Sequence, residues 1–346
     1  MTTVIERKKR LTLDEFTIQQ LRLFPNATGQ LSSLMRDIGL AAKRINAEIN
    51  KAGLLDIFGV TGDLNKHGEE VKKLDVFAND ELTNVLRNGV SCAGIGSEEW
   101  EGTMVFDDAK SNQSKYVVLF DPLDGSSNID NNICIGSIFG IYRRKSEVGS
   151  PCTTADFIQP GHRQVAAGYV IYGPSTVLVY ATRHGVNGFT LDPAIGEFCL
   201  SHPNIICPAN GTTYSINHSN FFQYSVGVRK YINDMQRWNE QVPDAFTQRY
   251  VGSMVADMHR TLLQGGIFLY PGNTDKPQGK LRLMYECNPF AFIFEAAQGE
   301  AIDGRQRIMD IVPKELHQRS QFYCGSSNMI NRLKQYLKWD IGKRRL

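Results

Sequence analysis

The sequence predicts an α/β protein in which helices cover mixed sheets, and three features carry that prediction. The chain has 346 residues, 42% of them hydrophobic and 21% charged, which is ordinary for one large globular domain or two. Residues 116–200 contain short apolar stretches separated by turns, a pattern typical of a sizeable mixed sheet. Residues 213–297 alternate between strand-like and helix-like segments, which indicates an α/β half.

Two amphipathic helices are expected before the sheet. Apolar residues recur three and four positions apart between Leu31 and Ile49, which predicts a helix over residues 28–53. A second helix is expected to begin at Glu69 and Glu70, whose carboxylates suit the positive end of a helix dipole. Residues 54–70 are polar with spaced glycines, so a mobile loop is predicted between the two helices.

The later elements follow in order along the chain. The expected strands of the first half are residues 116–120, 133–142, 165–172, 176–181, 188–191 and 197–200. A turn-rich boundary at residues 201–210 predicts two domains, residues 1–204 and 205–346. Beyond it, the expected strands are residues 213–216, 267–270 and 281–285, and the expected helices are residues 221–238, 254–263 and 289–297.

Composition excludes several classes of function. A net charge of +2 leaves no electrostatic footprint for nucleic acid, so no nucleic-acid partner is expected. No apolar run approaches the ~18 residues that a membrane span needs, and the first ten residues lack the apolar core of a secretory signal. A cytoplasmic protein without a membrane partner is expected. Seven scattered cysteines, none spaced as CxxC, predict reduced thiols rather than a thiolate zinc site.

Acidic residues follow three of the expected strands. Asp121 and Asp124 come directly after residues 116–120, Glu98 and Glu99 follow a small apolar segment, and Glu286 follows residues 281–285. Ligand sites in α/β sheets lie at the carboxyl ends of strands. Carboxylates gathered there repel one another unless a cation lies between them, and Mg²⁺ or Mn²⁺ is the cation that oxygen ligands select. Turn chemistry and a solvated surface are the alternatives for each pair taken alone.

The segment after Asp124 indicates a phosphate site. Gly125 allows a ligand to approach the backbone closely, and successive N–H groups together with the hydroxyls of Ser126 and Ser127 can cradle a phosphate. A carboxylate–metal cluster beside such a cradle is equipped for phosphoryl transfer to water.

At this point the chain resembles the class I fructose-1,6-bisphosphatases over residues 28–330. The segments that carry the resemblance are DPLDGSSNID from Asp121, GSEEW from Gly96, EEVKKLDVFAND from Glu69, RYVGSMVADMHRTL from Arg249, GGIFLYPGN from Gly265 and GKLRLMYECNPFAFIFE from Gly279. The resemblance implies a layered α-β-α-β-α sugar-phosphatase fold, with an AMP-type regulatory site and part of the metal site in the N-terminal domain. It also implies a sugar-phosphate-binding catalytic C-terminal domain.

The resemblance also implies roles for the acidic residues. Two or three divalent ions per subunit, Mg²⁺ with Mn²⁺ or Zn²⁺ as alternatives, would be held by Glu69, Glu98, Asp121, the Leu123 carbonyl, Asp124 and Glu286. Glu69 would reach the ions from a loop, at a position where many relatives have aspartate. Asp75 and Glu99 would activate the attacking water, with Glu98 as the third catalytic carboxylate.

Substrate contacts follow by the same resemblance. Asp124, Gly125, Ser126 and Ser127 would hold the 1-phosphate end with Arg282 nearby, Lys280 would reach the sugar, and Asn217, Tyr250 and Tyr270 would hold the 6-phosphate. Arg249 would come from a neighbouring subunit. From the residues alone, Lys280 and Arg282 share one strand face, because side chains alternate along a strand. The tyrosines alone would read as core aromatics.

A regulatory site is implied as well. Residues Thr28, Gly29, Gln30, Ser32, Lys115, Tyr116 and Arg143 match the AMP site of the family, although animal relatives have glutamate in place of Gln30. The first of them precede a long helix, whose free N–H groups suit a phosphate. Inhibition by AMP, with residues 54–70 as the switched element, and a homotetramer are therefore expected.

The predicted function is metal-dependent hydrolysis of the 1-phosphate of D-fructose 1,6-bisphosphate, a gluconeogenic reaction that yields fructose 6-phosphate and phosphate. The alternatives are a sedoheptulose-1,7-bisphosphatase or dual sugar bisphosphatase, and a catalytically silent sugar-phosphate sensor. An inositol phosphate phosphatase shares the Asp-Pro-x-Asp-Gly-Ser core, but Lys280 and LRLMYECNP argue against it. The spacing of Asp121 and Asp124 is not that of an aspartate-nucleophile phosphatase.

Overall fold

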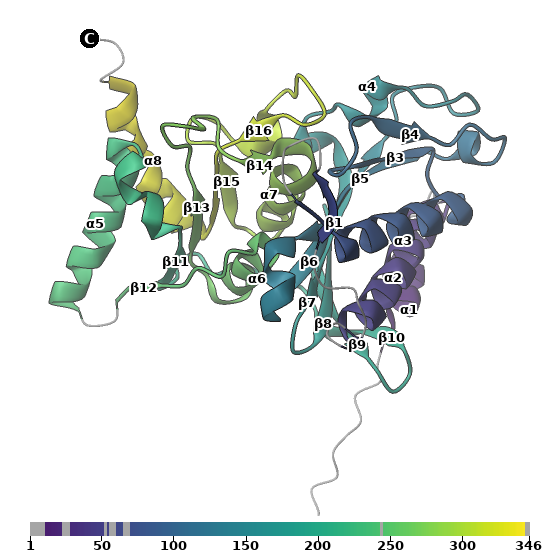
Figure 1. Cartoon of the computed structure of the whole chain (residues 1–346), viewed down its shortest axis with the longest axis horizontal. Helices are drawn as coiled ribbons and strands as arrows, with labels where there is room; N and C mark the ends of the chain where they lie inside the picture. The colour runs from purple at the N-terminus through teal and green to yellow at the C-terminus, as the bar shows by residue number, and fades with distance from the viewer. Residues whose placement is uncertain are drawn as a thin grey trace, which may run out of the picture.

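The computed structural model describes residues 11–22, 28–51, 54, 60–64, 70–242 and 245–342, arranged in five layers of helices and sheets (Figure 1). Helices α1–α3 cover one face of an eight-stranded sheet, and helices α6 and α7 fill the space between that sheet and a five-stranded one. Helices α5 and α8 cover the outer face of the second sheet. Each layer boundary is a continuous apolar core, which confirms the predicted class of mixed sheets with helices between and outside them.

Six of the eight strands of the large sheet correspond to those expected in the first half of the chain, and β3 and β4 extend the sheet beyond them. Its order is β10-β9-β8-β7-β6-β5-β3-β4, and its pairs are antiparallel except for β3 and β5. The register between β5 and β6 shifts between Asp121 and Asp124, so the strand is irregular at the predicted acidic motif. The strands are β3 (Gly94–Ser97), β4 (Thr103–Val105), β5 (Tyr116–Asp124), β6 (Ile135–Arg143), β7 (Gln164–Tyr172), β8 (Thr176–Thr182), β9 (Gly185–Asp192) and β10 (Glu197–His202).

The first helical layer comprises α1 (Leu13–Leu21), α2 (Gln30–Ile49) and α3 (Lys73–Gly89). The apolar stripe predicted for α2 is confirmed, since Leu34, Ile38, Ala42 and Ile45 are buried against the sheet. Helix α1 was not predicted.

Two expectations for the segment after α2 are wrong. Within the region expected to be a loop, β1 (Val60–Leu64) pairs antiparallel with β2 (Glu70–Lys72). Helix α3 therefore begins at Lys73 and not at Glu69, because Glu70 belongs to β2. Glu69 itself lies outside the described residues.

The second sheet has the order β12-β11-β13-β17-β15, and a separate pair joins β14 to β16. Its strands are short, and all except the edge strand β12 contribute buried residues to the cores between α6, α7 and the outer helices. The strands are β11 (Thr213–Ser215), β12 (Thr247–Gln248), β13 (Ile267–Tyr270), β14 (Leu281–Arg282), β15 (Glu300–Ile302), β16 (Arg319–Ser320) and β17 (Phe322–Gly325).

The helices of the C-terminal half are α5 (Val226–Gln241), α6 (Met254–Gln264), α7 (Asn288–Ala296) and α8 (Ser327–Gly342), with a short α4 (Thr154–Phe157) in the first half. The expected helix over residues 221–238 begins later, because the Ser225 hydroxyl accepts the Val228 N–H and caps α5. A 3₁₀ turn occupies residues 218–223.

The expected strand over residues 281–285 is also shorter than predicted. Only Leu281 and Arg282 are extended, and residues 283–287 form a π-turn that leads directly into α7. The apolar run predicts a strand as readily as a helix, because a short buried segment has no period that distinguishes the two. The π-turn matters for the site, because it carries Glu286.

Two further expectations concern the whole molecule. All seven cysteines are free, and six are buried, as predicted for reduced thiols. Among the described residues, no helix has the length and apolar character needed to span a membrane.

Candidate active site

An acidic cavity of about 610 Å³ lies where β3 and β5 end and the π-turn passes beside them. Residues from both halves of the chain form its walls, so the fold brings together acidic groups that are far apart in sequence. The lining residues named in the sequence analysis are Asp75, Glu98, Glu99, Asp121, Leu123, Asp124, Gly125, Ser126, Ser127, Tyr250, Tyr270, Lys280 and Glu286.

Three buried carboxylates form the centre of this cavity. Oxygen atoms of Asp121, Asp124 and Glu286 all lie within 4.8 Å of one another. Asp121 Oδ1 accepts the Leu123 N–H at 3.1 Å, and Glu286 Oε2 accepts the Arg282 N–H at 2.5 Å. Backbone donors thus fix two of the three side chains, which leaves their remaining oxygens directed to a common point.

The third carboxylate joins the two halves of the molecule. Asp124 Oδ2 accepts the Ser253 hydroxyl and the Val255 N–H, each at 2.9 Å. Ser253 precedes α6 and gives its hydroxyl to Asp124 rather than to its own helix. The end of β5 is therefore held against the start of α6.

Burial and the negative charges of neighbouring carboxylates raise the pKa of each member of the triad. Burial raises the pKa of Asp121 well above its ordinary value, and the charges of Glu98, Asp124 and Glu286 raise it further. Burial and the Glu98 charge likewise raise the pKa of Glu286. Burial raises the pKa of Asp124 to about 6, although its two hydrogen bonds offset part of the effect. Buried groups of this kind require a compensating cation to remain ionised together, so the set fits a divalent metal ion.

Glu98 and Glu99 follow β3 and face the same cavity. Glu98 is held by its backbone N–H, which donates to the Phe120 carbonyl at 3.0 Å. Its Oε1 lies 3.0 Å from Nε of Arg282, whose side chain is only 3% exposed. The Glu99 N–H donates to the Ser97 hydroxyl at 3.2 Å. Both carboxylates are thus placed by contacts around the end of β3.

Asp75 reaches the acidic cavity from helix α3. It is buried in the first turn of α3, where the helix dipole favours a carboxylate. It lines the cavity together with Glu99.

The glycine of the phosphate motif is required by geometry. Gly125 has φ +77°, and a Cβ at this position would lie 2.8 Å from Cβ of Ser253. A side chain would therefore meet α6 and demand an unfavourable backbone conformation. Residues 126–131 then form a 3₁₀ turn, which leaves Ser126 half-buried and Ser127 exposed at the cavity.

The predicted sugar-binding residues fall into three groups. Tyr250, Tyr270 and Lys280 line the acidic cavity, and Asn217 lines an adjoining space of about 70 Å³ together with Tyr270 and Lys280. Arg249 is exposed and belongs to neither described lining. Arg282 is also absent from both linings, and its buried side chain lies against Glu98.

Sequence reasoning missed the segment that supports Asp124. Asp257 is fully buried and lines the cavity, and its Oδ2 accepts the Val251 N–H at 2.9 Å and the Gly252 N–H at 3.3 Å. Its Oδ1 accepts from Arg260, at 2.5 Å. One signal could have revealed this support from the sequence: an Asp and an Arg lie three residues apart in an otherwise apolar helix. These bonds hold the turn that carries Tyr250 and Ser253.

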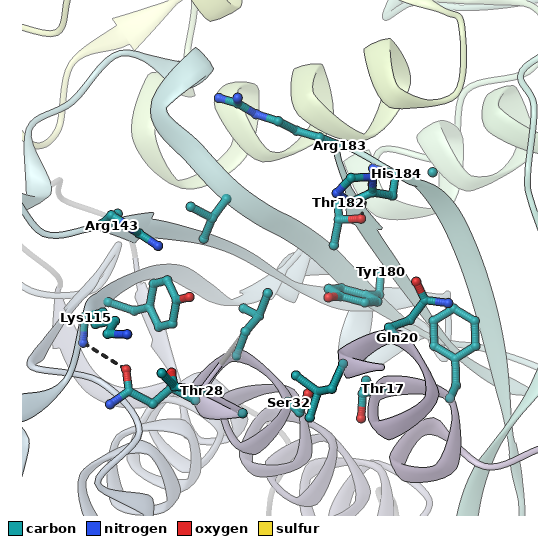
Figure 2. A pocket seen from close by; sticks show the side chains of 18 of the residues that line it. Thr17, Gln20, Thr28, Ser32, Lys115, Arg143, Tyr180, Thr182, Arg183 and His184 are labelled. Carbon is teal, nitrogen blue, oxygen red and sulfur yellow. Dashed lines mark hydrogen bonds between the residues drawn. The ribbon is translucent and has the colours of Figure 1, made fainter. Parts of the chain in front are cut away.

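A second and larger cavity, of about 920 Å³, lies between α1, the start of α2 and the ends of strands β5 to β9 in the large sheet (Figure 2). Gly29 precedes α2 with φ +79°, and no side chain caps the helix. The Lys115 N–H donates to Gln30 Oε1 at 3.3 Å, which is the dashed contact in Figure 2. All seven residues of the predicted AMP site line this cavity: Thr28, Gly29, Gln30, Ser32, Lys115, Tyr116 and Arg143.

Comparison with known proteins places the chain in a family. Residues 11–203 match the N-terminal domain and residues 207–338 the C-terminal domain of fructose-1-6-bisphosphatase. Two similar solved structures are Leishmania major fructose-1,6-bisphosphatase in its holo form, with 37% identity and a TM-score of 0.87, and in its T-state, with 37% identity and a TM-score of 0.83. Each comparison covers 95% of this chain and 99% of the other.

These matches extend over nearly the whole chain and include both halves that form the acidic cavity. The chain belongs to the fructose-1,6-bisphosphatase family, whose members are phosphatases that hydrolyse fructose 1,6-bisphosphate.

Proposed function

We propose that this chain uses the acidic cavity to hydrolyse the 1-phosphate of fructose 1,6-bisphosphate with the aid of divalent ions. The observation that carries the proposal is the buried triad of Asp121, Asp124 and Glu286 beside the glycine turn at Gly125. The triad supplies oxygen ligands, and the turn supplies backbone N–H groups close by. Family membership supports the same reaction.

The proposed metal ligands are Glu98, Asp121, the Leu123 carbonyl, Asp124 and Glu286, with Mg²⁺ as the ion and Mn²⁺ or Zn²⁺ as alternatives. Bound ions supply a water of lowered pKa and offset charge on the phosphoryl oxygens. Arg282 Nε lies 3.0 Å from Glu98, so this buried arginine orients a proposed ligand. Its proposed proximity to the 1-phosphate remains a prediction.

The substrate is proposed to lie with its 1-phosphate against residues 125–127 and Asp124. Lys280 would reach toward the sugar, and Asn217 in the adjoining space would hold the 6-phosphate together with Tyr250 and Tyr270, which line the acidic cavity. The exposed position of Arg249 is compatible with its proposed role in a neighbouring subunit of a homotetramer. Sedimentation velocity would test the tetramer, and a monomer at enzymatically active concentration would contradict it.

Proton transfer is assigned to the two remaining carboxylates. Asp75 and Glu99 line the cavity from α3 and from the end of β3, and we propose that they accept the proton of the attacking water. The bond from phosphorus to the water oxygen forms while the bond from phosphorus to O1 of the sugar breaks. The products are inorganic phosphate and fructose 6-phosphate, whose O1 takes up a proton.

A phosphate-release assay tests the reaction and the alternatives together. We expect release from fructose 1,6-bisphosphate with Mg²⁺ and none when the ion is chelated. Faster turnover of sedoheptulose 1,7-bisphosphate would favour that enzyme instead. Binding of the sugar bisphosphate without release of phosphate would identify the silent sensor and contradict the proposal.

We further propose that the larger cavity binds AMP and that AMP inhibits the reaction. Support comes from the uncapped N-terminus of α2, which faces a cavity also lined by Lys115 and Arg143. The division into domains at residues 204 and 205 remains part of this proposal, with the regulatory site in the first domain. An AMP titration that leaves the Mg²⁺-dependent rate unchanged would contradict inhibition.

A further inference from the structure

Tyr180 of β8 places an unpaired phenol hydroxyl in the second cavity. The side chain lines this cavity and is only 7% exposed. Figure 2 shows its hydroxyl directed into the cavity, toward the side where Lys115 and Arg143 lie. No hydrogen bond joins this hydroxyl to any residue that the structure describes. A buried tyrosine hydroxyl usually has a partner, so its position here indicates a group that binds in the cavity.

The other buried tyrosines of the large sheet are paired. Each of the three phenol oxygens lies within hydrogen-bonding distance of a polar side chain. The pairs are Tyr142 with the Asn288 amide at 3.2 Å, Tyr169 with His259 Nδ1 at 2.8 Å, and Tyr172 with the Ser137 hydroxyl at 3.0 Å. None of these three tyrosines lines the second cavity. The fold thus gives a partner to the phenols that protein surrounds, and Tyr180 differs because it faces a cavity.

The sheet sets the distance between Tyr180 and the cationic end of the cavity. Strands β6, β7 and β8 are consecutive neighbours, and Phe139 pairs with Gly168, which pairs with Tyr180. Adjacent strands lie about 4.8 Å apart, so the backbone of Tyr180 is roughly 10 Å from that of β6. Arg143 ends β6 and lies with Lys115 at the end of the cavity where α2 begins (Figure 2). A ligand that reaches from this end to Tyr180 is therefore longer than one phosphate group.

Helix α1 forms the opposite end of the cavity. Phe16, Gln20 and Leu21 line it, and Figure 2 shows Gln20 on the other side of Tyr180 from Lys115. Phe16 and Leu21 supply apolar surface, while the Gln20 amide carries both a donor and an acceptor. This combination suits the flat face and polar edge of a nucleobase. A nucleotide with its phosphate at α2 and its base at α1 has its ribose beside the Tyr180 hydroxyl.

The chemistry of the phenol also favours a ribose hydroxyl. Burial raises the pKa of Tyr180 above its ordinary value, and the nearby Tyr116 phenol raises it further. The Tyr180 hydroxyl is therefore neutral, with one donor and two acceptor sites. A neutral hydroxyl of a ligand can both donate to it and accept from it. A phosphate is better served by Lys115 and Arg143, whose charges strengthen the hydrogen bonds to its oxygens.

We infer that the Tyr180 hydroxyl forms a hydrogen bond with a ribose hydroxyl of the bound nucleotide, so that this cavity selects ribonucleotides over deoxyribonucleotides. The inference rests on the proposed binding of AMP, which places the phosphate at α2. Contacts to the phosphate and to the base are the same for both kinds of nucleotide. A site that bonds a ligand hydroxyl disfavours the analogue without it, because the protein group then loses its partner.

Calorimetric titration with AMP, 2′-deoxy-AMP and 3′-deoxy-AMP tests this contact without any measurement of catalysis. The three probes share the phosphate and the base, and each deoxynucleotide lacks one ribose hydroxyl. We expect the parent protein to bind one of the two deoxynucleotides roughly ten-fold more weakly than AMP. The probe that loses affinity identifies the hydroxyl that Tyr180 contacts.

Substitution of Tyr180 completes the test. Tyr180→Phe removes only the hydroxyl and keeps the ring that packs in the core. This variant should bind AMP about as weakly as the parent binds the affected deoxynucleotide, and its affinities for the two should agree within about two-fold. Tyr231→Phe is the matched control, because it removes a buried phenol hydroxyl of α5 outside the cavity. It should keep the parental preference.

Two outcomes would overturn the inference. In the first, the parent binds AMP and both deoxynucleotides equally tightly, which refutes the ribose contact and leaves AMP binding intact. In the second, the parental preference persists in Tyr180→Phe, so another group holds the ribose. If no nucleotide binds at all, the AMP proposal fails together with the inference.

Discussion

The two large cavities of this molecule differ in the sign of their charged groups and in how deeply those groups are buried. The acidic cavity centres on three buried carboxylates, each held by backbone donors or by a serine hydroxyl. The second cavity is lined by cations, among which Lys115 is half-buried and Arg143 is exposed. Buried and fixed charge is costly and suits an ion that must stay in position during chemistry. An exposed charge stays hydrated and costs little free energy, which suits a ligand that binds and dissociates reversibly.

The largest expected effect comes from removing one of the buried carboxylates. Asp121→Asn should lower kcat by more than about 100-fold, because even changes outside the ligand shell of a metal cost 10- to 100-fold. Steady-state phosphate release at saturating Mg²⁺ measures this effect. Glu147→Gln, which neutralises an exposed carboxylate outside the cavity, is the control and should retain parental kcat. Parental activity in Asp121→Asn would mean that the buried triad is structural.

Glu98→Gln sharpens the same test at the edge of the triad. It removes the charge of a proposed ligand that lies 3.0 Å from Arg282, and turnover should again collapse. Near-parental turnover at saturating Mg²⁺ would remove Glu98 from the proposed ligand set.

The next largest effect should come from Asp257, which holds the turn that carries Tyr250 and Ser253. Asp257→Asn should lower the free energy of unfolding by about 2–3 kcal/mol, since it weakens charged hydrogen bonds to Val251, Gly252 and Arg260. It should also raise KM, because the same turn carries Tyr250. Urea denaturation with steady-state kinetics measures both. A drop in stability with unchanged KM would restrict Asp257 to a structural role.

A pH series tests the electrostatics of the triad. Because burial raises the pKa of Asp124 to about 6, protons compete with the metal below that pH, and each ion bound displaces a proton. Mg²⁺ affinity should fall at least ten-fold per unit as pH drops below 6, because Asp121 and Glu286, whose pKa values burial also raises, take up further protons that the ion must displace. Calorimetric Mg²⁺ titrations from pH 5 to pH 8 provide the measurement. A flat profile would show that the carboxylates stay ionised without a cation.

The smallest effect is expected in the cationic cavity. Lys115→Met should weaken AMP binding roughly ten-fold, the effect of losing one charge-assisted hydrogen bond near the surface. Calorimetric titration of AMP measures this, and Lys110→Gln, an exposed lysine outside the cavity, is the control. Unchanged affinity would place the phosphate of AMP elsewhere.

Much of the fold could be predicted because its signals are local. The stripe of α2 and the strands β5 to β10 follow from the spacing of apolar residues a few positions apart. The sequence also indicated that Asp121, Asp124 and Glu286 would converge, but the expected reason, strand ends at one edge of a sheet, holds only for β5, because Glu286 lies on a π-turn.

What could not be predicted depends on distant contacts. Ser253 bonds Asp124 from 129 positions away, and neither residue signals the other. The π-turn at residues 283–287 resembled a strand because its apolar run has no distinctive period. Tyr180 and Arg143 come to line one cavity only through the order of β6, β7 and β8 in the sheet.

The most direct test of the account is anomalous diffraction from crystals soaked in Mn²⁺. We expect a manganese peak about 2.1 Å from oxygens of Asp121, Asp124 and Glu286, together with phosphate release by the same preparation. An active preparation whose manganese lies away from these three carboxylates would contradict it.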